Sequence, residues 1–182
     1  MCIRDSIPDD AHAFAMDVTV GEAVLVVMGP QARDFLSPLI PQSLTNEAFP
    51  FGTMQNIEIG HAVARAHRIT YVGELGWELY VSAEMANHVF ETIVARAEDH
   101  PLQFCGLHAL DSCRIEKAFR HFGHDISNED HVLEAGLGFA VKETKPAGRF
   151  GPMIGCDAVK AKRNDGLSHR LMQFRLKDPD LL

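Results

Sequence analysis

Hydrophobic residues recur along the chain with two periods, and each period predicts a different kind of element. The apolar run AVLVVM predicts a buried strand over Ala23–Met28. A helix is expected to follow it, with Gly29 at the cap and Pro30 at the first helical position, where its missing N–H costs nothing. The segments TMQNIEIG and HAVARAHRITYV predict two more strands that meet at Gly60.

The stretch ITYVGELGWELYV alternates like a strand, but two glycines and a glutamate interrupt it. If Gly73 and Gly76 bracket a tight turn, the strands Ile69–Val72 and Trp77–Val81 form a hairpin with Glu74 at its tip. Trp77, Leu79 and Val81 then share one face, which is expected to be core.

After Val81, the hydrophobic residues recur with the period of a helix. Ser82 is expected to cap a helix whose apolar face is formed by Met85, Val89, Phe90, Ile93, Val94 and Ala97. The stretch GLHALDSCRIEKAFRHFGHD predicts a second long helix that ends near Gly123. A short helix around Asp157–Arg163 and a strand over HRLMQFRL come next. Strands with hairpins alternate with helices, so the predicted fold class is α+β, with an antiparallel sheet and packed helices.

Two charged residues interrupt the apolar pattern of the second long helix. On the second long helix, Leu107, Leu110, Ile115, Ala118, Phe119 and Phe122 form an apolar arc, and Arg114 and Asp111 fall inside it. A guanidinium among apolar neighbours needs a partner. One explanation is a local Asp111–Arg114 pair. The other is that Arg114 and Glu74 face one pocket, which suits a flat heterocycle rich in N–H and C=O groups. For Glu74 alone, a solvated turn carboxylate is the alternative.

Composition narrows the possible functions. The 182 residues carry a net charge of −8, which argues against a nucleic-acid partner. No apolar run reaches the length of a membrane span. The four cysteines have neither zinc spacing nor a disulfide framework, so a cytoplasmic protein is expected. His121, His124 and Asp125 form one loose cluster, and no bound metal is expected there.

Several motifs, in this order and spacing, resemble a known family. RITYVGELGWELYV, GLHALDSCRIEKAFRHFGHDI and LEAGLGFAVK resemble the folate-binding aminomethyltransferase module of the glycine-cleavage T-protein family. GELGWE and RIEKAFRHFGHD are nearer to the C-terminal half of sarcosine and dimethylglycine dehydrogenases. The expected organisation is a cloning scar and partial segment over 1–16, a folate-binding core over 17–145, and over 146–182 a linker, short helix and strand leading toward a C-terminal barrel. The fold is expected to be truncated at both ends.

The resemblance implies a tetrahydrofolate site in which Glu74 and Arg114 hold the pterin ring and Tyr71 forms part of the wall. The family's catalytic aspartate is expected upstream of this chain, so no catalytic residue is assigned and the chain by itself is expected to be inactive. The implied function is capture of a one-carbon unit as 5,10-methylene-tetrahydrofolate in a flavin-dependent N-methylglycine dehydrogenase. FAD is then expected in an N-terminal half, and the substrate is a small N-methylated amine.

Two alternatives stay open. The first is the glycine-cleavage aminomethyltransferase, whose partner is a lipoyl carrier protein. The second is a non-catalytic folate-binding relative that acts in iron–sulfur assembly. Those relatives carry a cysteine-containing motif at the hairpin, and TYVGELG has none, so this alternative ranks last.

Overall fold

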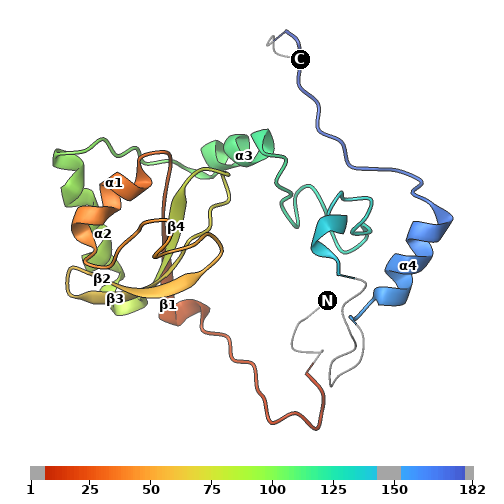
Figure 1. The fold of residues 1–182 in the computed structure, drawn as a ribbon, viewed down its shortest axis with the longest axis horizontal. Coiled ribbons are helices and arrows are strands. Elements are labelled where there is room, and N and C mark those ends of the chain that lie inside the picture. The colour runs from red at the N-terminus through yellow and green to blue at the C-terminus, as the bar shows by residue number, and fades with distance from the viewer. Residues whose placement is uncertain (1–6, 143–152, 179–182) are drawn as a thin grey trace. The chain divides into compact units, whose positions relative to one another are not determined.

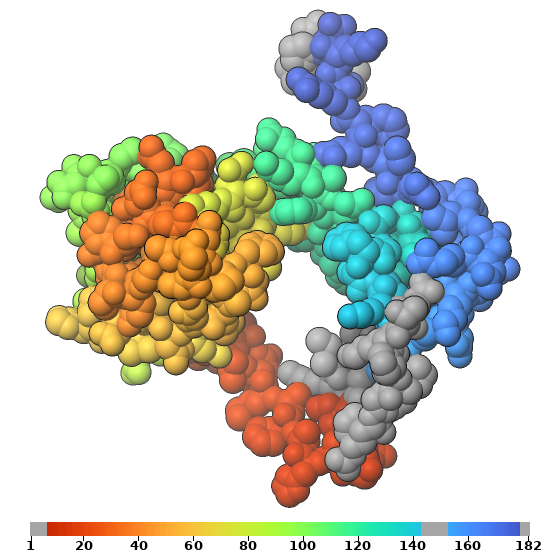
Figure 2. All heavy atoms as spheres, in the orientation of Figure 1, coloured from red at the N-terminus to blue at the C-terminus, as the bar shows by residue number. Residues whose placement is uncertain are grey.

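A computed structural model describes residues 7–142 and 153–178. The chain divides into two compact units, Met1–Lys117 and Ala118–Leu182. Figure 1 labels the helices and strands, and the space-filling view shows the strands and helices of residues 22–98 packed as one body (Figure 2). The predicted domain bounds at 16/17 and 145/146 stay predictions.

The first unit contains a four-stranded antiparallel sheet in the order β1-β4-β3-β2. The strands are β1 (Glu22–Met28), β2 (Met54–Ile59), β3 (Ala62–His67) and β4 (Gly76–Ser82). Strands β2 and β3 are joined at Gly60, whose φ is +58°, a conformation that glycine adopts without steric cost. The sheet with its helices confirms the predicted α+β class.

One face of the sheet carries the core. Trp77 and Leu79 of β4 are fully buried, and Val81 is 2% exposed, which confirms the predicted core face. Alternate residues of β2 and β3 are buried in the same cluster, namely Ile57, Ile59, Ala62, Ala64 and Ala66. The same core cluster contains Phe49, whose ring meets the Trp77 ring edge-on with the two ring centroids 6.1 Å apart.

The helices of the first unit differ in detail from the prediction. Helix α1 (Ala32–Leu36) begins two residues after Pro30, because Gly29 and Pro30 still belong to the turn that leaves β1. Ser82 stands at the N-cap position of the 3₁₀ turn Ala83–Met85, but its side chain makes no capping hydrogen bond. Helix α2 (Ala86–Ala95) buries Val89 and Ile93 as predicted, but Phe90 of the predicted face is 42% exposed. A 3₁₀ turn, Arg96–Glu98, ends the helix.

The predicted hairpin is wrong in one strand. Residues 68–75 form a loop between β3 and β4, so Ile69–Val72 is not a strand. The ladder between β3 and β4 runs from Arg65↔Tyr80 to His67↔Glu78, and the chain leaves the sheet after His67. The two strands of the hairpin are therefore β3 and β4, and the turn between them is wider than expected.

The second predicted helix, which was expected to end near Gly123, is shorter in the structure. Helix α3 (Leu107–Glu116) ends seven residues before Gly123, and Ala118 has a φ of +56°, which breaks the helical path. Within α3, Arg114 is buried, whereas Leu107 is 79% exposed and Ile115 is 47% exposed. The apolar arc expected from periodicity is therefore not a core face in the described residues.

The second unit has little regular structure in its described residues. It contains a parallel bridge between Phe122 and Ile126, a 3₁₀ turn over Gly138–Ala140 and helix α4 (Cys156–Asp165), which confirms the predicted short helix. The strand predicted over residues 169–176 is wrong, because those residues are coil and no described strand pairs with them. No helix in ranges 7–142 and 153–178 is long and apolar enough to cross a membrane.

Candidate functional site

The turn that carries Glu74 is fixed by backbone contacts at both ends. Gly73 has a φ of +70°, which a glycine adopts freely. Thr70 Oγ1 donates to the Glu74 carbonyl at 2.7 Å, and Gly29 N donates to the Leu75 carbonyl at 2.7 Å. These bonds hold the Glu74 backbone while its side chain remains 45% exposed.

Lys117, which directly follows α3, lies against this turn. Its Nζ is 3.5 Å from Glu74 Oε1, and both side chains are nearly half exposed. A Cβ on Gly73 would lie 2.5 Å from Lys117 Cγ, so the lysine stem runs over the glycine. An exposed ion pair of this length contributes between ~0 and 1 kcal/mol, so it is easily opened. Sequence reasoning missed Lys117, because nothing in its helical position marks a contact with residue 74.

Arg114 lies on the last turn of α3 and is 1% exposed. Its Nε donates to Asp111 Oδ1 at 2.7 Å, so the local pair considered from the sequence is present. Removal of Asp111 would leave a buried guanidinium without this carboxylate, which is costly. The pair explains how α3 accommodates a buried charge.

The described structure brings two of the predicted elements together. The Glu74–Lys117 contact joins the turn to the chain three residues after Arg114. Tyr71 is half-buried in the same loop as Glu74. The convergence of Glu74, Arg114 and Tyr71 on one ligand stays a prediction.

The histidine cluster has a local structural role. Asp125 accepts the His121 backbone N–H at 2.9 Å, and the His121 and His124 rings stack with centroids 5.6 Å apart. Within ranges 7–142 and 153–178, no three His, Cys, Asp or Glu residues are grouped so that they could hold a metal ion. The expectation that no metal binds there stays a prediction.

Comparison with known proteins gives consistent matches. Residues 1–145 match the family described as the GCVT N-terminal domain. The chain is 39% identical to 4-methylaminobutanoate oxidase (formaldehyde-forming) of Paenarthrobacter nicotinovorans, over 92% of this chain and 20% of the oxidase. It is 36% identical to human mitochondrial sarcosine dehydrogenase, over 85% of this chain and 16% of that enzyme. It is 34% identical to an aminomethyltransferase of Symbiobacterium thermophilum, over 86% of this chain and 41% of that enzyme.

A solved structure agrees with these sequence matches. The crystal structure of glycine cleavage system aminomethyltransferase T from Bartonella henselae superposes with a TM-score of 0.62 at 26% identity, over 81% of this chain and 38% of that one. The chain spans about a fifth of the length of the oxidase and dehydrogenase relatives. The resemblance expected from the motifs is confirmed: the chain belongs to the family of the GCVT N-terminal domain and is related to sarcosine and dimethylglycine dehydrogenases and to aminomethyltransferases.

Proposed function

We propose that the chain is the tetrahydrofolate-binding part of a flavin-dependent N-methylglycine dehydrogenase. In this proposal the one-carbon unit released from a methylated amine is captured as 5,10-methylene-tetrahydrofolate. The observation that carries the proposal is the contact between the Glu74 turn and the chain just after α3, where Arg114 is buried. The names of the oxidase and dehydrogenase relatives support the choice of an amine-oxidising enzyme.

The residues of the first unit fit this ligand chemically. Ionised Glu74 accepts hydrogen bonds, and a pterin ring presents N–H groups to such an acceptor. Arg114 supplies donors from a buried position, where a hydrogen bond to a ligand competes little with water. When bound, tetrahydrofolate supplies the nitrogens that take up the one-carbon unit. The chain's own contribution is to bind and orient the ring, which is a positioning role.

Lys117 is the group that a ligand would have to share or displace in order to bind Glu74. In the structure its ammonium group is the ion-pair partner of Glu74. A ring N–H that approaches Glu74 has to share or replace this partner, and the weak, half-exposed pair opposes the exchange little.

A glycine-cleavage aminomethyltransferase is the second candidate. The chain is 34–35% identical to two bacterial aminomethyltransferases, of which it spans a larger share, 41–43%. Under this candidate the folate site keeps the same residues, and the partner is a lipoyl carrier protein.

Tetrahydrofolate titration of the full-length protein tests the folate site. Glu74→Gln removes a charged acceptor and keeps the side-chain shape, so affinity should fall roughly ten- to hundredfold, or about 1.5–3 kcal/mol. The matched control is Glu58→Gln, an exposed strand glutamate on β2 whose loss should leave affinity unchanged. Equal affinity of the two variants, both folded by circular dichroism, would remove Glu74 from the site.

A further inference from the structure

Two arginines of the first unit lie over the ring of Trp77. The Cζ atoms of Arg33 and Arg68 are each 5.9 Å from the centre of this ring. Arg33 belongs to α1 and Arg68 directly follows β3, so two elements that lie apart in the sequence bring their guanidinium groups to one place. Trp77 is fully buried, and both arginines are half-buried.

Neutral acceptors from the loop between Leu44 and Phe49 hold the two guanidinium groups. Asn46 Oδ1 accepts from Nη2 of both arginines at 2.7 Å. The Leu44 carbonyl accepts from Arg33 Nε at 2.8 Å, and the Phe49 carbonyl accepts from Arg68 Nη1 at 2.6 Å. Such acceptors fix the direction of a guanidinium group but leave its positive charge in place, because arginine stays protonated.

The two positive charges repel each other across Asn46. Burial, followed by the charge of Arg33, lowers the pKa of Arg68 below its usual value. The carboxylate of Glu47 opposes this change through its charge, from an exposed position. Two guanidinium groups against one exposed carboxylate leave this part of the protein with a net positive charge.

Two buried donors of the same stack lack an acceptor. Arg68 Nε and Trp77 Nε1 are buried and have no hydrogen-bond partner among the residues that the structure describes. Native structures leave few buried N–H groups unpaired, so each such group indicates a bound water or ion. A water molecule would accept from these donors, whereas an anion would also offset the charges of the two arginines.

We propose that Arg33 and Arg68 bind a small inorganic anion, such as chloride or phosphate, beside the ring of Trp77. Asn46 is exposed, so an ion reaches the two guanidinium groups from solvent. The bound ion reduces the repulsion between the arginines and so stabilises the first unit. The anion site uses none of the residues assigned to folate.

Fluorescence of Trp77, the sole tryptophan, tests the proposal directly. The protein is titrated with potassium phosphate and, separately, with potassium chloride, while potassium gluconate keeps the ionic strength constant. The emission should change saturably with at least one ion. The melting temperature should rise by roughly 3–6 °C when that ion is at about ten times its Kd. The absence of a saturable change with both ions, as expected if water occupies the site, would overturn the proposal.

Asn46→Asp places a carboxylate between the two arginines, where it takes over the role of the anion. This variant should bind the ion at least roughly tenfold more weakly than wild type, because the added carboxylate repels an anion and pairs with both guanidinium groups. The matched control is Asn87→Asp, an exposed position on α2 that adds the same charge and should bind the ion like wild type. Equal affinity of the two folded variants would overturn the proposal.

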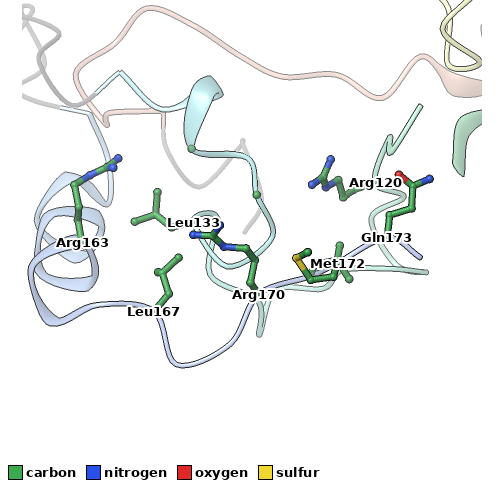
Figure 3. Close-up of a pocket in the computed structure, with 10 residues that line it drawn as sticks. Arg120, Leu133, Arg163, Leu167, Arg170, Met172 and Gln173 are labelled. Atoms are coloured by element: carbon green, nitrogen blue, oxygen red, sulfur yellow. The ribbon is translucent and has the colours of Figure 1, made fainter. Parts of the chain in front are cut away.

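The arginines of the second unit require a separate control. A cavity of about 620 Å³ in that unit is lined in part by Arg120, Arg163 and Arg170 (Figure 3). Arg170→Gln should leave the response to the ion unchanged. A loss of the response in Arg170→Gln, with an unchanged response in Asn46→Asp, would place the anion in the second unit and overturn the proposal.

Discussion

A methyl group added at Gly76 tests how the Glu74 turn is held against the sheet. Gly76 pairs with Met28 at the end of the β1–β4 ladder. A Cβ at this position would lie 2.5 Å from Val27 O, 2.6 Å from Thr70 Cγ2 and 2.8 Å from Met28 Cα. Two of these atoms belong to the β1 backbone, so the strand itself has to move.

Two opposing effects decide whether Gly76→Ala stabilises or destabilises the protein. Replacing a glycine that has no positive φ by alanine reduces unfolded-state freedom and stabilises by ~0.4–1 kcal/mol. Overpacking against fixed backbone destabilises by ~1–3 kcal/mol. The overpacking cost wins, so Gly76→Ala should lower the free energy of unfolding by up to about 2.6 kcal/mol. At about 2–4 °C per kcal/mol, the melting temperature falls by up to about 10 °C.

Fluorescence of Trp77 during urea unfolding measures this change, because Trp77 is the sole tryptophan and is fully buried. The matched control is Gly21→Ala, which has open space around the added Cβ and no positive φ, and should be neutral or slightly stabilising. If Gly76→Ala is as stable as Gly21→Ala within about 0.5 kcal/mol, the close packing of β1 against the end of the turn is refuted.

Two further predictions concern polar contacts. Asn46→Ala should destabilise by ~0.5–1.5 kcal/mol in urea unfolding, because Asn46 Oδ1 accepts from both Arg33 Nη2 and Arg68 Nη2 at 2.7 Å. Stability equal to wild type would contradict this. The hydrogen bond from Lys162 is the main cause that lowers the pKa of Glu134. The ionised Glu134 carboxylate therefore stabilises the fold above the unfolded-state pKa, and this stabilisation is lost as pH falls through the folded-state pKa. Thermal melts between pH 6 and pH 3 should therefore show a steeper loss of stability in wild type than in Glu134→Gln, and parallel curves would contradict it.

Strands and buried faces were predictable where local pattern and tertiary packing agree. The alternation of Trp77, Leu79 and Val81 matches a strand with one buried face, and the structure buries all three. Residues Ile69–Val72 alternate similarly but form loop. Arg68 leaves the strand to donate to the Phe49 carbonyl at 2.6 Å and to stack 5.9 Å from the Trp77 ring centroid. Local periodicity carries no information about such long-range contacts.

The candidate site was predictable only in part. Arg114 stood out because a charge interrupts an apolar arc, and its burial is confirmed, although the arc itself is exposed and α3 ends at Glu116. Lys117 could not be predicted, because its contact with Glu74 joins residues 43 positions apart through tertiary placement. The strand predicted over residues 169–176 had the right alternation, but a strand also needs a neighbour, which sequence alone does not supply.

A crystal structure of the full-length protein with tetrahydrofolate bound tests the central claim most directly. The proposed site predicts a Glu74 carboxylate oxygen within about 2.7–3.2 Å of a pterin N–H, with Arg114 facing the same ligand and Lys117 moved away from Glu74. A pterin bound elsewhere, with the Glu74–Lys117 pair still closed, would contradict it.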